Sequence, residues 1–330
     1  FVHLHLHSQF SLLDGANRLD DVVAAAAAAG MPAMALTDHG NMFGAIEFYK
    51  KAKKAGVKPI VGIEAYTTSG RLTDRDPANQ SSNHLVLLAK NHTGYKNLIK
   101  LSTRAFLEGF YYKPRMDKEL LRQHSEGIIA LSACLKGEIN EKITANREHE
   151  AEASAREMLD IFGPGNFYLE LQNHGIPEQI QANEVLRRIG RKLGIPLVAT
   201  NDVHYLRHGD HKPHDILLCI GTGKSVNDQN RLKYHGDQFF LKTAEEMWQV
   251  FGDYPELAYL RLIERNKPEV MRSAPHEALW KGKIDCCIDA LEDAARDEQS
   301  ARQPEHDSVR AFKLGQAGAQ LLPSVRSVLK

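Results

Sequence analysis

The sequence lacks long apolar runs and has few cysteines. No stretch of 18 apolar residues occurs, and the Ala-rich run at 22–29 is too short to cross a bilayer, so we expect no membrane contact. The four cysteines include no C-x-x-C pattern, and a chain of 330 residues can build a core without disulfides. We therefore expect a reducing, cytoplasmic compartment.

Net charge is also lacking, because 42 Lys and Arg residues balance 42 Asp and Glu residues. This balance excludes a protein that binds nucleic acid through a bulk positive field, but it leaves room for an enzyme that holds one strand end locally. The chain does not begin with Met and shows no signal peptide, so we expect a fragment or a trimmed chain. What is abundant is histidine: the 16 residues are the first indication of metal.

Short β-type runs alternate with amphipathic helical patterns along the chain. The β-type runs are 2–6, 33–36, 59–63, 84–89, 127–131, 166–171 and 196–199, and the helical patterns are 19–29, 44–55, 94–106, 139–162 and 178–193. Alternation of this kind is typical of parallel strands, and about seven repeats favour a closed α/β barrel. A doubly wound open sheet is the alternative fold.

The first β-type run places His3, His5 and His7 on one face, because successive side chains of a strand point to opposite sides. Histidine is the commonest metal ligand, so this face predicts a metal site. A fortuitous His-rich terminus or the remnant of a tag is the alternative interpretation.

Most of the later β-type runs also end in a residue that can bind metal. These residues are Asp38, His39, Glu64, Cys134, Asp202 and His204, whereas His84 opens its run. In an α/β barrel the C-terminal strand ends form one rim, which is where active sites lie. Residues spread over two hundred positions are therefore expected to share one pocket.

Several stretches resemble one known family. They are residues 3–15 (HLHLHSQFSLLDG), 36–41 (LTDHGN), 58–66 (KPIVGIEAY), 108–115 (EGFYYKPR), 169–175 (LELQNHG) and 199–205 (ATNDVHY). They resemble the PHP (polymerase and histidinol phosphatase) domain, in the branch that opens the alpha subunit of bacterial DNA polymerase III, a C-family DNA-directed DNA polymerase. The resemblance implies a distorted (β/α)7 TIM-like barrel. It also implies partners among the remaining polymerase domains and the replisome subunits.

The resemblance further implies a cluster of nine metal ligands. They are His5, His7, Asp14, His39, Glu64, His84, Cys134, Asp202 and His204. By resemblance, one ion is held by His5, His7, Glu64 and Asp202, a second by Glu64, His84 and Cys134, and a third by Asp14, His39 and His204. His3 and Asp38 are expected to orient ligand imidazoles.

This mixture of imidazole, carboxylate and one thiolate suits Zn²⁺, with Mn²⁺ or Fe²⁺ as alternatives, rather than Mg²⁺ or Ca²⁺. We expect two to three divalent transition-metal ions. Neighbouring ions can bind a phosphodiester, lower the pKa of a water and stabilise the leaving oxygen. Glu64, Asp202 and His7 are the expected catalytic residues.

The segment 109–115 offers groups for binding the 3′ end of DNA. Lys113 and Arg115 could contact phosphates, and Tyr111 or Tyr112 could stack on a base. A solvated loop with a packed aromatic side chain is the alternative.

The resemblance ends near residue 262, so we expect a metal-dependent phosphoesterase domain at 1–262 and an unrecognised tail at 263–330. Within the tail, 284–295 has the pattern of an amphipathic helix, and the charged run 296–307 is typical of a solvated linker. The tail is therefore expected to be partly helical or disordered. The Gly-rich segment and catalytic carboxylates of the polymerase palm are absent from the sequence, so we expect that this chain alone does not polymerise DNA.

Three functions compete. The first is a 3′–5′ exonuclease that proofreads beside the polymerase. The second is a non-catalytic scaffold that is stabilised by metal and binds polymerase or exonuclease partners; the complete ligand set favours catalysis over it. The third is a free-standing PHP phosphatase, against which the polymerase-type segment 108–115 counts.

Overall fold

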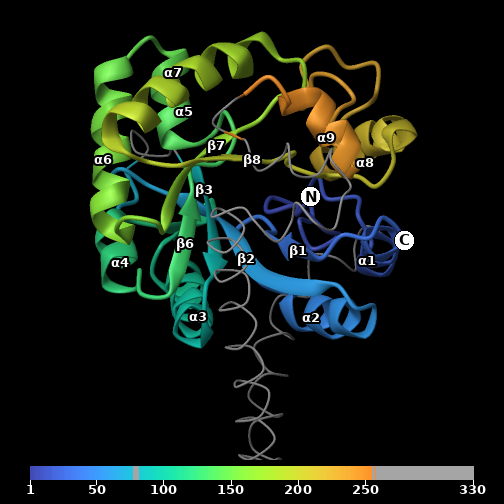
Figure 1. The fold of residues 1–330 in the computed structure, drawn as a ribbon, viewed down its shortest axis with the longest axis horizontal. Coiled ribbons are helices and arrows are strands. Elements are labelled where there is room, and N and C mark those ends of the chain that lie inside the picture. Colours follow the sequence, from blue (N-terminus) through green and yellow to red (C-terminus); the bar gives the residue numbers. More distant parts are fainter. Residues whose placement is uncertain (77–81, 255–256, 258–330) are drawn as a thin grey trace, which may run out of the picture. The chain divides into compact units, whose positions relative to one another are not determined.

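A ring of strands surrounded by helices forms the fold (Figure 1). The structure is a computed structural model that describes residues 1–76, 82–254 and 257. Its strands are β1 (Ala33–Leu36), β2 (Lys58–Thr67), β3 (Asn83–Ala89), β4 (Phe110–Tyr111), β5 (Lys113–Met116), β6 (Ile128–Leu131), β7 (Phe167–Leu171) and β8 (Leu197–Ala199). Its helices are α1 (Leu19–Ala28), α2 (Ala45–Lys54), α3 (His92–Leu107), α4 (Lys118–Gln123), α5 (Glu138–Thr144), α6 (Glu148–Phe162), α7 (Pro177–Leu193), α8 (His211–Thr222) and α9 (Ala244–Phe251).

The strands follow one another around the ring. The order β2-β3-β6-β7-β8 runs through one sheet, and β1 pairs with the first half of β2. The N-terminal segment closes the circle, because His3 bridges to Met34 of β1 and Leu6 bridges to Val203 just after β8. The predicted distorted (β/α)7 barrel is thereby confirmed, although its first strand consists only of these isolated bridges.

One strand of the ring runs against the others. β3 is antiparallel to both β2 and β6, whereas β1–β2, β6–β7 and β7–β8 are parallel. The prediction of an all-parallel barrel is therefore wrong at β3. The reversal explains why His84 opens its strand: the N-terminal end of an antiparallel strand lies at the same rim as the C-terminal ends of its neighbours.

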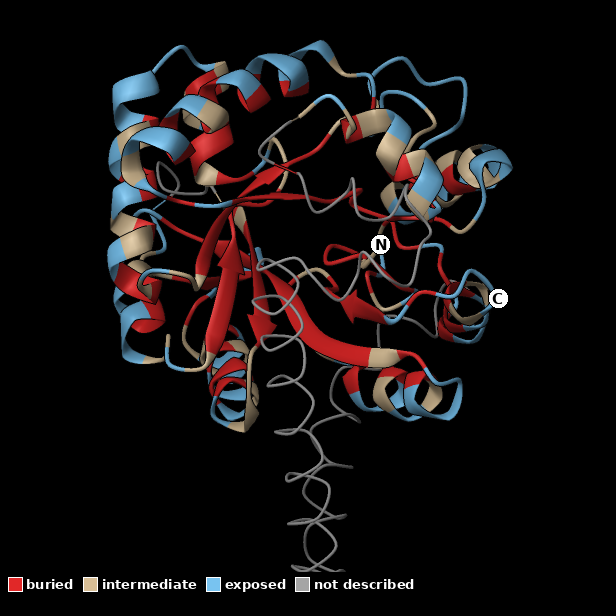
Figure 2. Ribbon diagram, in the orientation of Figure 1, coloured by how far each residue is buried: buried red, intermediate tan, exposed pale blue. Residues whose placement is uncertain are grey.

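Successive strand residues face two different apolar clusters, because side chains alternate along a strand. In β3, Leu85 and Leu87 pack in the large cluster that includes residues of the covering helices, whereas Val86 and Leu88 pack in a second cluster with Ile129 of β6. Figure 2 shows the strands buried and the helices exposed on their outer sides. This arrangement is a barrel filled with side chains, and only its rim is left for polar chemistry.

The helices mostly begin and end where the sequence predicts. Pro177 occupies the first turn of α7, and Gly194 ends that helix with a φ of 67°. The predicted helix 139–162 is two helices, α5 and α6, because Asn146 takes a left-handed φ of 59° that no helix interior allows. The β4–β5 hairpin and helices α4, α8 and α9 were not predicted.

The predictions for the C-terminal tail fall outside the described residues. They are the helix at 284–295, the linker at 296–307 and the domain boundary at 262.

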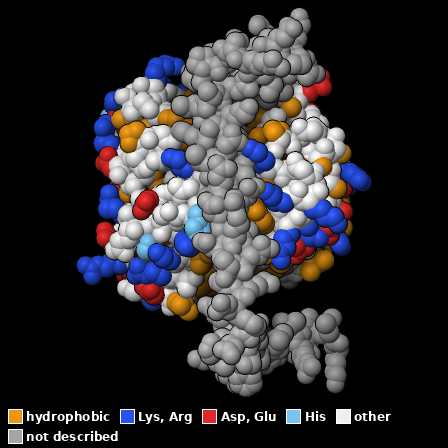
Figure 3. Space-filling view, turned by 60° about the horizontal axis from the view of Figure 1, so that its bottom comes forward, with side chains coloured by type: hydrophobic (Ala, Val, Ile, Leu, Met, Phe, Trp, Pro, Cys, Tyr) orange, Lys and Arg blue, Asp and Glu red, His pale blue; other side chains and the backbone are white. Residues whose placement is uncertain are grey.

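The described part of the chain has no helix that is both long enough and apolar enough to cross a membrane. On the face shown in Figure 3, Lys and Arg side chains are interspersed with acidic and apolar ones, which agrees with the balanced composition.

Candidate metal centre

Four predicted ligands meet in what we call the inner corner: His5, His7, Glu64 and Asp202. The Nε2 atom of His5 lies 3.1 Å from Glu64 Oε1 and 3.3 Å from Asp202 Oδ1. The Nε2 atom of His7 lies 3.1 Å from Asp202 Oδ1 and 3.7 Å from Glu64 Oε2. Atoms that bind one ion at about 2.0–2.2 Å in a tetrahedron stand roughly 3.3–3.6 Å apart, so these spacings fit a shared cation.

Three further atoms form the thiolate corner, made of Glu64, His84 and Cys134. His84 Nδ1 lies 2.9 Å from Glu64 Oε1, and Cys134 Sγ lies 3.7 Å from His84 Nδ1 and 3.9 Å from Glu64 Oε1. Glu64 therefore presents its carboxylate to both corners. Ala133, just before Cys134, takes a left-handed φ of 62°, and Asp202 has a φ of 44°. Such backbone is costly for residues other than glycine and gathers at functional sites.

The outer corner consists of Asp14, His39 and His204. Asp14 Oδ2 lies 3.2 Å from His39 Nε2 and 3.9 Å from His204 Nε2. The other nitrogen of His39, Nδ1, lies 2.6 Å from Glu64 Oε2. His39 therefore connects the outer corner to the bridging carboxylate.

The second nitrogen of each inner imidazole is held by a fixed partner. His5 Nδ1 lies 2.7 Å from Glu170 Oε1, an acceptor, so Nδ1 carries a proton and Nε2 is the nitrogen that faces Glu64 and Asp202. His7 Nδ1 lies 3.1 Å from Ser11 Oγ, whose own proton goes to Asp38 Oδ1 at 2.8 Å. Asp38 thus reaches the imidazole of His7 through Ser11, and its orienting role stays a prediction.

Every ion-pair partner of Asp14, Glu64, Glu170 and Asp202 in the described part of the chain is a histidine. Burial opposes a charge on His39, but Glu64 and Asp14 raise the pKa of this histidine to about 10. Burial lowers the pKa of His7 to about 3, and burial, then Glu64, raises the pKa of Cys134 well above its usual range. Against the opposing effect of burial, the four buried carboxylates raise the pKa of the His5 and His39 imidazoles that face them, and a centre with this much buried negative charge favours a bound cation.

The contacts among the buried polar atoms test whether these residues fit metal ions. Six buried atoms make no contact with hydrogen-bond geometry: His5 Nε2, His7 Nε2, Asp14 Oδ1, His39 Nδ1, Glu64 Oε2 and Asp202 Oδ1. Most of them lie close to one another instead, as His39 Nδ1 does to Glu64 Oε2 at 2.6 Å and His7 Nε2 to Asp202 Oδ1 at 3.1 Å. Ligand atoms that face one small volume in this way fit a shared cation. The donor set of imidazole, carboxylate and thiol is of the kind that binds transition metals.

All nine predicted ligands therefore converge, but two other predicted residues do not reach the centre. His3 Nε2 lies 2.8 Å from the carbonyl oxygen of Lys242, so His3 does not orient a ligand imidazole. Arg115 is fully buried, its Nε faces the carbonyl oxygen of Gly109 at 3.5 Å, and its guanidinium donates to the carbonyl of Asp74. The prediction that Arg115 contacts substrate is not supported, because its guanidinium holds the hairpin loop together.

Lys113 lies at the edge of the centre. Its Nζ is 3.2 Å from the hydroxyl of Tyr66, whose ring centroid is 5.3 Å from that of His84. The neighbouring Tyr112 is 72% exposed and has a left-handed φ of 58°. Both side chains are free of the core, as a substrate contact requires.

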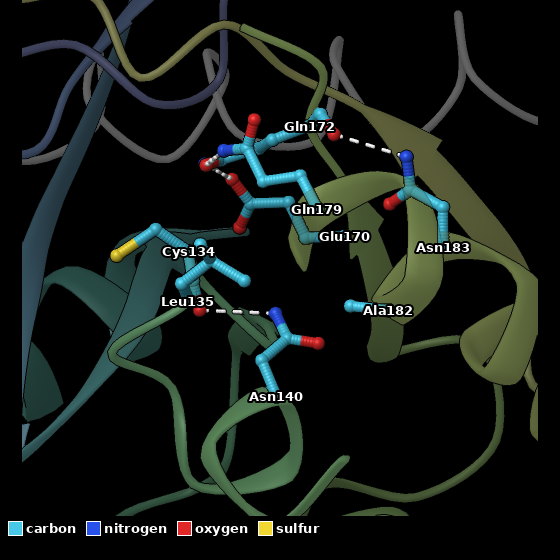
Figure 4. A pocket seen from close by; sticks show the side chains of 8 residues that line it. All are labelled: Cys134, Leu135, Asn140, Glu170, Gln172, Gln179, Ala182 and Asn183. Carbon is cyan, nitrogen blue, oxygen red and sulfur yellow. Dashed lines mark hydrogen bonds between the residues drawn. The ribbon is translucent and has the colours of Figure 1, made fainter. Parts of the chain in front are cut away.

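Sequence reasoning missed Glu170 and Tyr234. Glu170 lies in β7 and also accepts a hydrogen bond from Gln172 in a small pocket lined by Cys134 and Asn183 (Figure 4). A single acidic residue in the apolar run FYLEL of β7 was the available signal. Tyr234 touches the outer corner from a segment that shows no strand or helix pattern, so no signal pointed to it.

Comparisons with known proteins found a matching family, similar relatives and a similar solved structure. Residues 3–174 match the PHP domain family. The DNA polymerase III subunit alpha of Borreliella burgdorferi is 52% identical over 258 residues, covering 78% of this chain and 22% of that protein. The DNA polymerase III subunit alpha of Thermus aquaticus is 50% identical over 252 residues, covering 75% of this chain and 21% of that protein. The chain thus spans about a fifth of the length of these relatives. Among solved structures, an amidohydrolase from Chromobacterium violaceum with bound sulfate and no metal has a TM-score of 0.42 at 15% identity, covering 62% of this chain and 87% of that one.

Proposed function

Because the chain belongs to the PHP domain family, we propose that it is the metal-dependent phosphoesterase domain of a DNA polymerase III alpha subunit and that it removes nucleotides from the 3′ end of single-stranded DNA. The partners in this proposal are the remaining polymerase domains and the replisome subunits. The observation that carries the proposal is the convergence of buried ligand atoms of His5, His7, Glu64 and Asp202 within about one ion's coordination distance of each other.

In this proposal each corner holds one divalent ion, Zn²⁺ or alternatively Mn²⁺ or Fe²⁺. Bound ions supply Lewis acidity, which lowers the pKa of a water and stabilises charge on the leaving oxygen. Glu64, Asp202 and His7 are the proposed catalytic residues. Glu64 would serve both the inner and the thiolate corner, because its Oε1 lies near His5 and near His84. Glu170 and Ser11 would keep the inner imidazoles in the ligating tautomer.

We propose that substrate approaches from the side of His39 and His84, the more open part of the centre. Their side chains are 14% and 16% exposed, whereas His5 and His7 are fully buried. On that side the ammonium of Lys113 can pair with a phosphate oxygen, and the exposed ring of Tyr112 can stack on the terminal base.

A second candidate is a non-catalytic scaffold in which the ions stabilise the barrel. The observation that favours it is the complete burial of the inner corner, since structural metal sites are closed and catalytic sites keep an open position. In this case the shape of the domain, rather than hydrolysis, would serve the polymerase partners.

One experiment separates the two candidates. The full chain, loaded with Zn²⁺ or Mn²⁺, is incubated with single-stranded DNA labelled at the 5′ end, and shortening from the 3′ end is followed with time. Elemental analysis of the same sample counts the ions, and calorimetry with and without chelator measures their effect on the melting temperature. Each ion at a hundredfold excess over its Kd should stabilise the fold by roughly 3 kcal/mol.

Asp202→Asn serves as the variant that removes a ligand charge, and Asp160→Asn on α6 as the matched exposed control. Release of nucleotides by the wild type and the control, but not by Asp202→Asn, supports the nuclease. Full metal loading with no release by any of the proteins would establish the scaffold. A metal content well below one ion per chain, not restored by added Zn²⁺ or Mn²⁺, would overturn both candidates.

A further inference from the structure

The segment between α8 and α9 is attached to the barrel by Arg231 and brings Tyr234 into the metal centre. Residues 223–233 are exposed except for Arg231, whose two terminal nitrogens lie 2.6 and 2.7 Å from the carboxylate oxygens of Asp215 on α8. Three residues further on, Tyr234 turns toward the barrel. The bidentate pair therefore fixes an otherwise solvated segment just before the residue that enters the metal centre.

Tyr234 ends against the outer corner. Its hydroxyl lies 2.8 Å from His204 Nε2 and 3.2 Å from Asp14 Oδ2. Its ring packs against His204, with centroids 5.0 Å apart, and against Phe239, with centroids 4.8 Å apart. The hydroxyl thus lies beside two of the three groups that form this corner.

The nitrogen that Tyr234 contacts is the one that His204 would use to bind an ion. His204 Nδ1 lies 2.8 Å from the carbonyl oxygen of Asp202, which can only accept, so Nδ1 carries a proton. In the neutral imidazole the single lone pair is then on Nε2, which lies within hydrogen-bond distance of the Tyr234 hydroxyl and can accept its proton. Asp14 Oδ2 is the other acceptor within reach of that proton. While Nε2 accepts the hydrogen bond, it cannot also bind a metal ion.

We propose that the hydroxyl of Tyr234 competes with a divalent ion for His204 Nε2, so that the outer corner binds its ion only when this tyrosine withdraws. The inference rests on the proposed function, because it requires that the outer corner is a metal site. It makes the third ion conditional, whereas the inner corner has no such competitor: the Nε2 atoms of His5 and His7 have no hydrogen-bond partner.

The test is a stepwise titration of the metal-free full chain with Zn²⁺ in the presence of a chromophoric chelator. Tyr234→Phe removes the hydroxyl and keeps the ring, and the third ion should then bind roughly fivefold more tightly, which is the equilibrium worth of about one hydrogen bond. The first two affinities should not change. Tyr168→Phe is the matched control, because Tyr168 is a buried tyrosine whose hydroxyl donates to the carbonyl of Gly165 at 3.2 Å.

A second variant, Arg231→Lys, and a spectroscopic signal ensure that the test does not depend on Tyr234→Phe alone. Arg231→Lys breaks the bidentate pair that fixes the segment, and it should tighten the third site in the same direction by a smaller factor. In the wild type, the third step should also change the near-ultraviolet tyrosine signal, and this change should be lost in Tyr234→Phe. Equal or weaker third-ion binding by Tyr234→Phe, with the first two steps intact, overturns the inference alone. Absence of any bound ion in all proteins overturns it together with the proposed function.

Discussion

The inner and outer corners use the same kinds of side chain, yet they differ in what their imidazoles contact. In the inner corner the Nδ1 atoms of His5 and His7 are fixed by Glu170 and Ser11, and both Nε2 atoms face carboxylate oxygens of the same corner. In the outer corner the Nε2 atom of His204 instead lies at hydrogen-bond distance from Tyr234, which is not a proposed ligand. The difference teaches that the residues around equivalent imidazoles decide which nitrogen is available; if our proposals hold, the inner site is permanent and the outer one conditional.

The largest effect is expected from a substitution of Glu64, because this residue contacts histidines of both the inner and the outer corner. Glu64→Gln keeps the shape of the side chain but removes the charge that faces His5, His39 and His84. At least one ion should be lost. Nuclease activity should fall more than ~100-fold. Loss of a residue that only hydrogen-bonds to a metal ligand already lowers activity or metal affinity roughly 10–100-fold, and Glu64 is itself a proposed ligand. Elemental analysis and the nuclease assay measure the two effects. Glu108→Gln, at an exposed pair with Arg104, is the control; wild-type metal content in Glu64→Gln would show that the corners are wrongly assigned.

Glu170→Gln should separate the corners. The amide can still accept a hydrogen bond from His5, but it lacks the charge that increases the basicity of the imidazole. The affinity of the inner corner should fall roughly 10–100-fold while the outer corner keeps its affinity. Stepwise Zn²⁺ titration measures both, with Glu148→Gln at an exposed pair with Arg188 as the control. An equal loss at the outer corner would contradict the separation.

Ser11→Ala should have a smaller effect on the same corner. The hydroxyl of Ser11 accepts from His7 Nδ1 and from the His39 amide, and it donates to the buried Asp38. Its loss should weaken the inner site by about tenfold and lower the free energy of unfolding by about 1–3 kcal/mol. Chemical denaturation measures the second value. Ser125→Ala is the control, at a half-buried serine whose hydroxyl donates to the carbonyl oxygen of Arg122 at 3.4 Å. It should leave both quantities nearly unchanged, and an effect of the same size there would remove the assignment to Ser11.

The smallest effect is expected outside both corners. Lys113→Ala should raise KM for single-stranded DNA about three- to fivefold and leave kcat and metal content unchanged, because an exposed charge contributes up to about 1 kcal/mol. The difference from wild type should shrink as salt rises. Steady-state kinetics at several salt concentrations measure this, with Lys192→Ala as the control at an exposed pair with Glu152. A fall in kcat with unchanged KM would place Lys113 in the chemistry instead.

Much of the fold could be predicted because the spacing of apolar residues within a strand or helix depends only on residues that are close in sequence. Alternation in β3 and the ends of α7 follow from neighbouring residues. The reversal of β3 could not be predicted, since direction depends on which strand ends meet in space. The break at Asn146 was hidden because the helical period continues across it.

The metal centre was predictable to the extent that its residues stand at strand ends. Glu64 and Asp202 follow the predicted apolar runs 59–63 and 196–199 and were found, although β2 itself continues past Glu64 to Thr67. Glu170 was missed because it lies within the predicted run 166–171, between Leu169 and Leu171. Tyr234 was missed because it enters from a segment without any pattern. Arg115 was misplaced because sequence does not reveal which of two neighbouring cations in 113–115 is folded into the loop.

The closure of the ring by the N-terminal segment has a consequence for the order of folding. His3 meets the carbonyl of Lys242 across 239 positions, and His5 meets Glu170 across 165. Contacts this distant require a large loss of chain entropy before they form, and such topologies fold slowly. During synthesis the first segment must therefore wait for nearly the whole described chain to emerge. An ion that binds His5 and Asp202 together would then bind late in folding and would link the first-synthesised segment of the barrel to the segment that follows its last strand.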